Sequence, residues 1–452
     1  MLFSIALFTA CGGARNDLPS TASMSTATLE AAQRPFTQES TIYEFKGAPD
    51  GGNPYAGLLA GNNGEFYGTT NAGGAKGPSG LVDGTVYEVS STGTERVLYS
   101  FQGGSDGAGT EAGVIAGQNG VLLGVTDYGG GATACTGGCG TVYALTPSGS
   151  NYTERVLYPF GGGSDGAIPL GTLVMDKSGA LYGTTNSGGT GCTGTPSGVT
   201  GCGTVFKLTP AGSGYTEKVL YKFKGGNDGA FPKAALIADS SGALYGTTQF
   251  GGGTSGCSTS PSGDTSCGIA FKVTASGHET VIYRFQGGTN DGGNPRSALL
   301  AGKNGALFGA TVFYGSSTAC GSSGCGTVFE LARAKKGYTE KVIYNFGSIS
   351  KDAARPDDPN GLYADASGDL FGTASLNLAP KCACGAVFEL TPSGSGYTET
   401  VLHDFTGTSN GARLTGSITA DSSGTLYGTT FTGGKKVKSC GGGCGVVFKV
   451  AP

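Results

Sequence analysis

The chain has 452 residues, of which 88 are Gly and none is Trp, and charged residues make up only 13%. The formal net charge of −4 is small for this length, and no run of basic or acidic residues points to a nucleic-acid partner or a disordered acidic tail. A glycine-rich chain with few charges and no collagen period is typical of a turn-rich, all-β protein.

The first residues predict export. Residues 1–10 form a signal peptide whose apolar run is too short to span a membrane as a helix. Phe8-Thr9-Ala10-Cys11 resembles a bacterial lipobox, which would make Cys11 the lipidated residue. No Lys or Arg precedes the run and Phe8 stands where Leu is usual, so an ordinary signal peptide with a chance Cys is the alternative. Residues 11–40, rich in Ser, Thr and Ala, are predicted to form a flexible tether.

From residue 41 onward the chain repeats one unit seven times. Each unit has an apolar strand ending in aromatic-x-Phe, a Gly-Asp-Gly loop, a leucine-rich strand, Leu-Tyr-Gly-Thr-Thr and Gly-Thr-Val-Phe-Lys-Leu. The closing Phe recurs every 56 to 63 residues, at Phe45, Phe101, Phe160, Phe223, Phe285, Phe346 and Phe405. A regular period of this size marks a repeat architecture, in which one unit is too small to fold alone.

Each unit is predicted to hold four antiparallel strands. In the third unit these cover residues 170–175, 180–185, 203–208 and 216–223. The last of them alternates with a period of two, since Val219, Tyr221 and Phe223 share one face. Asx-containing turns with Gly, such as Asp176-Lys177-Ser178-Gly179, suit the hairpins between them. Four antiparallel strands repeated radially describe the blades of a β-propeller.

The two ends of the repeat region predict how the ring closes. The first element after the tether is a single strand over 41–45, equivalent to the fourth strand of a unit, and the last element, over 445–450, is a third strand with no fourth after it. The N-terminal strand can therefore complete the last blade and cover its edge. We predict one all-β domain over 41–452, a seven-bladed β-propeller. An open β-solenoid is the alternative, but it would be expected to show distinct capping units.

Twelve of the 13 Cys residues predict disulfides. Apart from Cys11 they form local pairs, each between a Tyr-Gly-Thr-Thr-like and a Gly-Thr-Val-Phe-like strand: Cys135/Cys139, Cys192/Cys202, Cys257/Cys267, Cys320/Cys325, Cys382/Cys384 and Cys440/Cys444. This pattern is typical of an oxidising compartment. Zinc is the alternative, but the only two His residues, His278 and His403, are remote from every pair. The Cys382/Cys384 bridge would be near the geometric limit.

The Gly-Asp-Gly loops carry the only candidate metal ligands. The aspartates are Asp50, Asp106, Asp165, Asp228 and Asp291, with Asp357 and Asp358 offered by the sixth unit and Asn410 by the seventh. If the ring brings these carboxylates together at the mouth of its channel, they would suit Ca²⁺. Since Asp-Gly is a common turn pair, turn formation is the simpler role. No catalytic residue and no other cofactor is predicted.

The repeat also resembles a known family. Ala180-Leu-Tyr-Gly-Thr-Thr, followed by Gly-Gly and Cys202-Gly-Thr-Val-Phe-Lys-Leu, looks like the Gloeo/Verruco (GloVer) tandem repeat, and the resemblance covers about residues 41–452. Proteins of this choice-of-anchor family are bacterial, exported and attached to the surface by differing signals. The resemblance implies a location and brings no catalytic residues with it.

These observations predict an exported lipoprotein of the outer membrane, the cell surface or the periplasm. We expect a monomer that touches the membrane only through its lipid anchor and uses a propeller face as a binding or scaffold module for a surface protein or glycan. The alternative is a secreted hydrolase, lyase or lactonase with a cation site at the channel mouth. An enzyme should show unique polar residues that converge in one sector, and the insertion over 348–360 is the sequence candidate for them.

Overall fold

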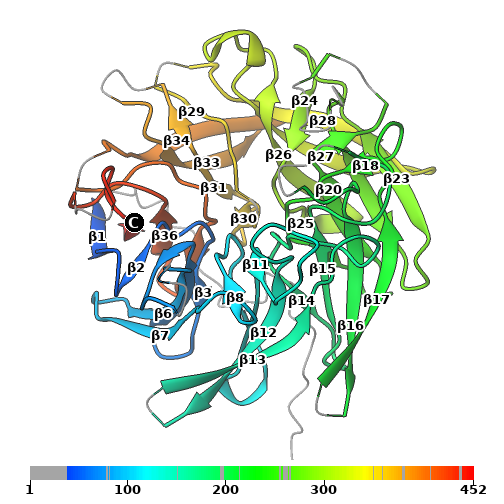
Figure 1. The fold of residues 1–452 in the computed structure, drawn as a ribbon. Coiled ribbons are helices and arrows are strands. Elements are labelled where there is room, and N and C mark those ends of the chain that lie inside the picture. Colours follow the sequence, from blue (N-terminus) through cyan, green and yellow to red (C-terminus); the bar gives the residue numbers. More distant parts are fainter. Residues whose placement is uncertain are drawn as a thin grey trace, which may run out of the picture.

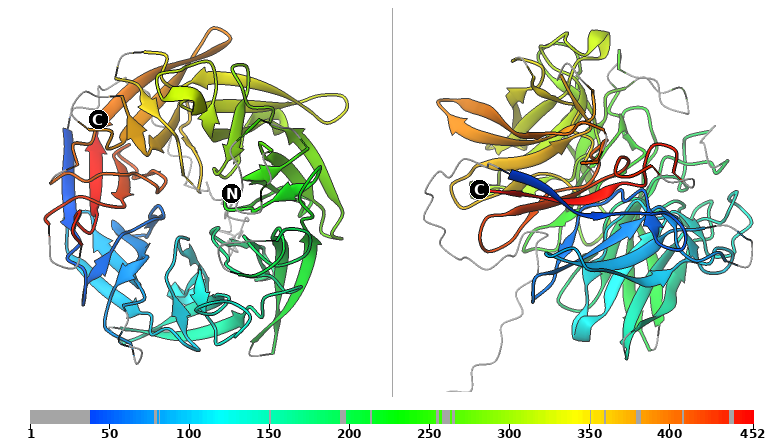
Figure 2. Two further views of the ribbon diagram at one scale, coloured as in Figure 1. Left: turned by 45° about the horizontal axis from the view of Figure 1, so that its top comes forward. Right: turned by 90° about the vertical axis from the view of Figure 1, so that its left-hand side faces the viewer.

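A computed structural model describes residues 38–452, except 78–79, 81, 150, 194–197, 213, 254–255, 258–262, 264–265, 350, 359, 379–381, 408 and 437–439. The predicted signal peptide, Cys11 and residues 12–37 of the predicted tether lie outside the described residues. Seven antiparallel sheets, each with four main strands, stand side by side in a ring, so that the predicted seven-bladed β-propeller is confirmed (Figures 1 and 2).

The blades follow one another in chain order, and their strands run in order from the channel outward. Blade 1 has β3 (Leu59–Ala60), β4 (Glu65–Thr70), β6 (Thr85–Ser90) and β7 (Glu95–Ser100), and blade 2 has β9 (Ile115–Ala116), β10 (Leu122–Thr126), β12 (Thr141–Ser148) and β13 (Asn151–Pro159). Blade 3 has β14 (Val174–Met175), β15 (Leu181–Thr185), β16 (Thr204–Ala211) and β17 (Gly214–Lys222). Blade 4 has β19 (Ile237–Ala238), β20 (Leu244–Thr248), β22 (Ile269–Val273) and β23 (Glu279–Arg284). Blade 5 has β25 (Leu300–Ala301), β26 (Leu307–Tyr314), β27 (Thr327–Arg333) and β28 (Tyr338–Asn345); blade 6 has β30 (Tyr363–Ala364), β31 (Leu370–Ala374), β33 (Ala386–Ser393) and β34 (Gly396–Asp404); blade 7 has β35 (Thr419–Ala420), β36 (Leu426–Thr430), β37 (Val446–Ala451) and β1 (Gln38–Glu44).

Short ribbons join two kinds of loop in every blade: the entry loop before the innermost strand and the loop between the second and third strands. They are β2 (Gly51–Gly52) with β5 (Ala72–Gly73), β8 (Gly107–Ala108) with β11 (Tyr128–Gly129), β18 (Gly229–Ala230) with β21 (Phe250–Gly251), β24 (Gly292–Pro295) with β26, β29 (Ala353–Ala354) with β32 (Leu376–Asn377), and the bridges Ala167–Ser187 and Ala412–Thr432. Both kinds of loop therefore lie on one side of the ring, which we call the loop face. The helical elements of the described residues are three 3₁₀ turns, η1 (Gln118–Gly120), η2 (Lys303–Gly305) and η3 (Gly321–Ser323).

The N-terminal strand closes the ring. β1 pairs antiparallel with β37 from Gln38 opposite Ala451 to Glu44 opposite Val446, with one irregularity between Thr41 and Tyr43. In Figure 2 the two strands, at opposite ends of the colour scale, lie next to each other in the same blade. The predicted pairing of the first and last strands is therefore confirmed, although β1 already begins at Gln38.

The glycine of the Leu-Tyr-Gly-Thr-Thr motif lets an aromatic ring pack against the strand. A Cβ on Gly183 would lie 2.6 Å from Cζ of Phe206, whose ring meets Phe160 of blade 2 edge to face at 5.1 Å between centroids. The same stacking recurs between successive blades, for example between Phe285 and Phe329. This close approach at the glycine builds the core between blades.

The innermost strands are much shorter than predicted. The third unit was expected to form a strand over 170–175, but β14 covers only Val174–Met175. Ile168 has a left-handed backbone with φ of 58°, and Pro169 has no N–H to donate to a ladder. The next residues instead make polar contacts toward other blades, as when Thr172 accepts a hydrogen bond from the Gly113 N–H at 3.1 Å.

We expect the protein to become more stable when the hydroxyl groups of two buried tyrosines are removed. Tyr87 and Tyr143 are fully buried at a position where the other five blades have Phe, and neither hydroxyl has a hydrogen-bond partner among the described residues. Because an unpaired buried hydroxyl costs about 1–3 kcal/mol, Tyr87→Phe should raise the free energy of unfolding by about 1 kcal/mol. Chemical denaturation checks this, with Tyr99→Phe as a matched control that should lose stability because the Tyr99 hydroxyl donates to Asp106 at 2.9 Å. A destabilised Tyr87→Phe variant would contradict the prediction.

Candidate functional site

The entry loops place one residue of each blade at the mouth of the channel. Each entry loop contains one residue with φ between 55° and 60°, and the residue two positions later lies just before the innermost strand. These later residues are Tyr55, Glu111, Leu170, Lys233, Arg296, Asp357 and Thr415. The backbone of this position is repeated in all seven units, whereas the side chains differ in every unit.

The six predicted disulfides are confirmed, with Cα–Cα distances of 4.9 to 5.2 Å, and they support the entry loops. The backbone N–H of each positive-φ residue donates to the carbonyl oxygen of the second Cys of the preceding blade at 2.7 to 2.9 Å; the pairs are Ile168–Cys139, Phe231–Cys202, Asn294–Cys267, Arg355–Cys325, Arg413–Cys384 and Asn53–Cys444. In the unit without a disulfide, the Asp83 carbonyl accepts from Gly109 at 2.7 Å. Stiffening the cysteine loops therefore also fixes the channel mouth.

Five of the mouth residues form what we call the channel-mouth cluster: Tyr55, Glu111, Lys233, Arg296 and Asp357. The Lys233 ammonium donates to the Tyr55 hydroxyl at 2.8 Å, pairs with the Glu111 carboxylate at 3.0 Å and lies 4.8 Å from the centre of the Tyr55 ring. The Arg296 guanidinium pairs with the Asp357 carboxylate at 2.9 Å. These contacts bring side chains of blades 1, 2 and 4 together and link blade 5 to blade 6.

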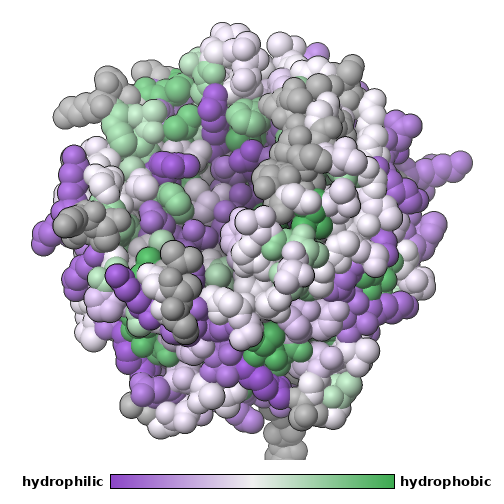
Figure 3. All heavy atoms as spheres, viewed as in Figure 1, coloured by the Kyte–Doolittle hydropathy of each residue, from purple (hydrophilic) through white to green (hydrophobic). Residues whose placement is uncertain are grey.

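The cluster is packed but open to solvent. The side chains of Lys233 and Asp357 are 15% and 16% exposed, and those of Arg296 and Glu111 are 25% and 26% exposed. Deeper contacts cross the ring, since the Thr172 hydroxyl of blade 3 donates to the Asn360 side chain of blade 6 at 2.6 Å. Figure 3 shows hydrophilic residues gathered over β30, β31 and β33, near the middle of that view. A ligand can therefore reach the charged groups without entering a wide pore.

The surroundings of Tyr55 and Lys233 fix the protonation states of these two side chains. Burial and the negative charge of Asp357 raise the pKa of Tyr55 to about 12, so Tyr55 keeps its proton at neutral pH. Burial lowers the pKa of Lys233, but the nearby Tyr55, Glu111 and Asp357 outweigh it and raise that pKa above its usual range. Tyr55 is therefore a hydrogen-bond donor and Lys233 a permanent cation, and neither acts as a general base at neutral pH.

One further carboxylate lies beneath the cluster. Asp127, at the end of β10, is 2% exposed and accepts a hydrogen bond from the Glu111 N–H at 3.1 Å. Burial, together with the negative charge of Glu111, raises the pKa of Asp127 well above its ordinary value. A protonated Asp127 would be a proton donor held directly behind Glu111.

The five aspartates predicted as metal ligands lie elsewhere, beside the outermost strands. Asp50 shows the pattern: one carboxylate oxygen accepts from the Tyr43 hydroxyl at 2.9 Å and the Lys46 N–H at 2.9 Å, and the other accepts from the Gly51 N–H at 2.7 Å. The other four, Asp106, Asp165, Asp228 and Asp291, likewise accept from the tyrosine of their own outer strand and from N–H groups of their own loop. Among residues 38–452 as described, no three His, Cys, Asp or Glu side chains are grouped to hold a metal ion.

The sixth unit keeps the same bond with a different residue. Asp352 accepts from the Tyr344 hydroxyl at 3.0 Å and from the Ser348 N–H at 2.7 Å, so Asp352, and not Asp357 or Asp358, is the counterpart of the loop aspartates. Ala353 follows it where the other units have Gly, which hid the match in the sequence. Asp357 joins the channel-mouth cluster, and Asp358 accepts from the Asn360 N–H at 2.9 Å.

Addition of Ca²⁺ tests the predicted metal role of the five loop aspartates. Their carboxylates are bonded within separate loops, an arrangement that does not fit one shared cation site. We therefore expect millimolar Ca²⁺ to leave the melting temperature unchanged, because only a ligand that binds the folded state shifts it. A melting temperature that rises with Ca²⁺ and returns with chelator would contradict this expectation, and Mg²⁺ at equal ionic strength is the control.

The chain is similar to known proteins both in its repeat sequence and in its fold. A model of the Gloeobacter/Verrucomicrobia repeat matches residues 26–196, 136–312 and 256–452. No curated protein matches significantly. Similar solved structures include a putative 6-phosphogluconolactonase from Bacteroides fragilis (13% identity, 82% of this chain and 89% of that chain, TM-score 0.47), another from Bacteroides uniformis (12%, 76% and 84%, 0.45) and an ulvan lyase (10%, 80% and 86%, 0.44). Likeness at this level carries nothing about activity.

Proposed function

This chain belongs to the Gloeobacter/Verrucomicrobia repeat family, and we propose that it is an exported propeller that binds a hydroxyl-rich glycan at its channel mouth. The observation that carries the proposal is the channel-mouth cluster. Its side chains occupy a position whose backbone is the same in all seven blades, yet they differ from blade to blade. They make contacts in two groups: Lys233 with Tyr55 and Glu111, and Arg296 with Asp357. Differences of this kind are not needed for the repeat to fold, so a ligand is the simplest reason for them.

The chemistry of the cluster favours a ligand with many hydroxyl groups. Lys233 and Arg296 supply N–H donors, Glu111 and Asp357 supply carboxylate acceptors, and Tyr55 supplies a hydroxyl that stays protonated. Each sugar hydroxyl both donates and accepts, and such a mixed set can bond to it from two sides. The cations and carboxylates are already paired, which lowers the cost of ordering them when a ligand binds.

Export and anchoring complete the proposal. Six disulfides fit an oxidising compartment, and within the described residues no helix is long and apolar enough to cross a membrane. Lipidation of Cys11 would leave the propeller as a monomer on the outer membrane, the cell surface or the periplasmic side. Metabolic labelling with a fatty-acid analogue tests this anchor, and equal labelling of wild type and Cys11→Ser would rule it out.

Glycan binding by variants of Lys233 tests the function. With Cys11 replaced by Ser, the full chain is applied to an array of neutral and acidic oligosaccharides. We expect Lys233→Met to weaken capture about tenfold or more, because a hydrogen bond to a charged group contributes about 1.5–3 kcal/mol. Lys207→Met is the matched control, since Lys207 lies over the Tyr182 ring of blade 3 at 5.2 Å from its centre, outside the cluster. Equal capture by both variants would refute a glycan site at the channel mouth.

A catalytic role is the second candidate, favoured by the buried Asp127 behind Glu111. Burial raises the pKa of Asp127 well above its ordinary value, and two neighbouring carboxyl groups in unequal environments are the pairing used for acid–base chemistry, as in a glycan hydrolase or lyase. Captured oligosaccharides should then be shortened or unsaturated, which mass spectrometry detects. Unchanged oligosaccharides after prolonged incubation would leave binding as the function.

A further inference from the structure

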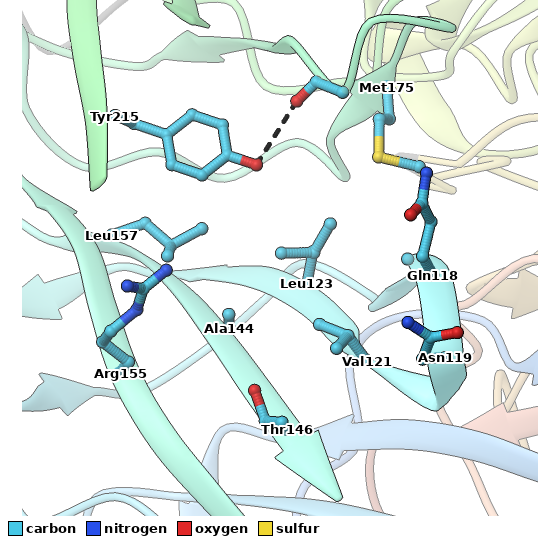
Figure 4. A pocket seen from close by; sticks show the side chains of 12 residues that line it. Gln118, Asn119, Val121, Leu123, Ala144, Thr146, Arg155, Leu157, Met175 and Tyr215 are labelled. Atoms are coloured by element: carbon cyan, nitrogen blue, oxygen red, sulfur yellow. Dashed lines mark hydrogen bonds between the residues drawn. The ribbon is translucent and has the colours of Figure 1, made fainter. Parts of the chain in front are cut away.

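A pocket lies between blades 2 and 3, at the end of the blades opposite the loop face (Figure 4). It has a volume of about 370 Å³. Its floor is apolar and includes Leu123 of β10, Ala144 of β12 and Leu157 of β13, all of which belong to the core between these two blades. Met175 and Tyr215 of blade 3 form the facing wall. No part of the pocket overlaps the channel-mouth cluster.

The pocket exists because blade 2 departs from the repeat at two facing positions. Leu123 stands directly opposite Ala144 in the ladder between β10 and β12. In the other six blades the equivalent pair is an aromatic residue opposite a long charged one: Tyr67–Glu88, Tyr182–Lys207, Tyr245–Lys272, Phe308–Glu330, Phe371–Glu389 and Tyr427–Lys449. Blade 2 therefore lacks both a ring and a long side chain at the same place.

The neighbouring blades show what this space accommodates. In blade 3 the Tyr182 ring fills it, the Lys207 ammonium lies 5.2 Å from the ring centre, and the Tyr182 hydroxyl donates to Asp176 at 2.9 Å. Gly117 takes the place of Asp176 in blade 2, so the partner of the hydroxyl is absent as well. The vacated volume is that of a substituted aromatic ring, and its apolar lining favours such a ring over water.

Polar groups surround the opening. The exposed Arg155 of β13 stands directly opposite Ala144. Burial raises the pKa of Tyr215, and the nearby positive charge of Arg155 opposes that rise. Gln118 and Asn119 of η1 and Thr146 of β12 add exposed amide and hydroxyl groups on the other sides, as Figure 4 shows. Among the residues that the structure describes, none that lines the pocket carries a carboxylate. A cation and neutral hydrogen-bonding groups around an apolar floor favour an anionic ligand.

We propose that this pocket binds a small aromatic acid, with its ring in place of the missing tyrosine and its carboxylate against Arg155. The proposal is independent of the glycan site, because it rests on different residues at the opposite end of the blades. The ring would pack between Leu123 and Met175, and its apolar contacts would supply most of the affinity. The charged group would set the choice between acids and neutral phenols.

Titration of the full chain, carrying Cys11→Ser, with 4-hydroxyphenylacetate tests the proposal by calorimetry. We expect saturable binding at one site per chain. The double variant Leu123→Tyr, Ala144→Lys restores the pair found in blades 3, 4 and 7, so it should remain folded with an equal or higher melting temperature while binding weakens at least tenfold. Lys233→Met, at the channel mouth, is the control and should bind as wild type does.

A second variant separates the contribution of the ligand's aromatic ring to binding from that of its carboxylate. Arg155→Met should weaken binding of 4-hydroxyphenylacetate about tenfold, by loss of a charged hydrogen bond, and leave binding of 4-ethylphenol unchanged. Absence of saturable binding to wild type at millimolar concentrations, or equal binding by the filled double variant, would overturn the proposal. Saturation by a tyrosine-containing peptide but not by the acid would also overturn it, and would assign the pocket to a protein partner.

Discussion

Deletion of β1 should open the ring and abolish the stable monomer. β1 supplies the outermost strand of blade 7, and Phe45, which follows it, is 1% exposed and meets the Tyr87 ring of blade 1 edge to face at 5.0 Å. Burial of Phe45 alone contributes about 1.5–3 kcal/mol. Without β1 the edge of β37 is exposed and open to pairing with other chains. We expect a chain beginning at Gly47 to aggregate or to melt at least about 10 °C lower, as measured by light scattering and circular dichroism.

Transfer of the same strand to the other end of the chain is the control. Placing residues 38–46 after Pro452 with a two-residue turn would build blade 7 in one piece, in the way that a hairpin joins β16 to β17 in blade 3. This permuted chain should recover the melting temperature of the wild type within a few degrees. A deletion variant that remains monomeric and melts as wild type does would show that β1 is dispensable for closure.

Mild acid should stabilise the propeller, because six glutamates are held beside aspartates at the junctions between blades. Burial, followed by the charge of the aspartate in the entry loop of the same blade, raises the pKa of five of them to about 7: Glu95, Glu154, Glu217, Glu279 and Glu340. Burial, followed by the neighbouring Asp352, raises the pKa of the sixth, Glu399, to about 9. In each of the first five, one carboxylate oxygen is buried with no hydrogen-bond partner in the part of the chain that the structure describes.

The sign of the effect follows from these raised values. A carboxyl group whose pKa is higher in the folded state than its unfolded value near 4.5 binds its proton more tightly when folded. Its contribution is fully present below about pH 4.5 and is lost as the pH rises through 7. The glutamates remain partly exposed, so solvent screening reduces each contribution. We expect the melting temperature to be about 5 °C higher at pH 5.5 than at pH 8.5.

A single substitution isolates one junction. Glu217→Gln keeps the shape of the side chain and removes its charge, so it should raise the melting temperature at pH 8.5 and leave it nearly unchanged at pH 4.5. Glu44→Gln is the matched control, since the Glu44 carboxylate faces the Lys435 ammonium at 3.9 Å and should gain nothing at high pH. A melting temperature that climbs steadily from pH 5.5 to 8.5 would contradict the proposed role of these glutamates.

A second set of carboxylates limits the stabilisation at low pH. Burial would raise the pKa of Asp176, Asp239 and Asp421, but hydrogen bonds from the serine, tyrosine and backbone groups of their turns outweigh it and lower their pKa values. Their contribution to stability is lost as the pH falls below about 4. Maximum stability is therefore expected between about pH 4.5 and 6.

Much of the fold could be predicted from the sequence because the seven units share one pattern. A period of two in the outer strands, the Asp-Gly turns and the unequal ends of the repeat region were enough to predict the blades and the pairing of β1 with β37. The local spacing of the Cys residues likewise predicted all six disulfides. The short innermost strands were missed because alternation of side chains does not reveal that backbone groups beside these strands bond to a neighbouring blade, as the Gly113 N–H does to Thr172.

The candidate sites were harder to predict because they lie where the units differ. The repeated polar residues are Asp50 and its counterparts, which hold the loops to the outer strands. Lys233 and Arg296 each follow a proline in a loop, so in the sequence they resemble solvent-exposed residues. Only the closed ring, which brings blades 1 to 6 around one channel, shows that they belong to one cluster. Leu123 and Ala144 are ordinary apolar residues, and only comparison with the aligned pairs of the other blades reveals the missing ring and side chain.

Glycan affinity and melting temperature, measured together for two sets of variants, test most directly whether function lies where the repeat is broken. The first set neutralises the channel-mouth cluster one residue at a time (Tyr55→Phe, Glu111→Gln, Lys233→Met, Arg296→Met, Asp357→Asn). The second neutralises the repeated loop aspartates (Asp50→Asn, Asp106→Asn, Asp165→Asn, Asp228→Asn, Asp291→Asn). We predict that the first set loses affinity with little change in melting temperature, and that the second loses melting temperature but keeps its affinity. Loss of affinity confined to the second set would place the function on the repeated residues and contradict the assignment of the channel mouth.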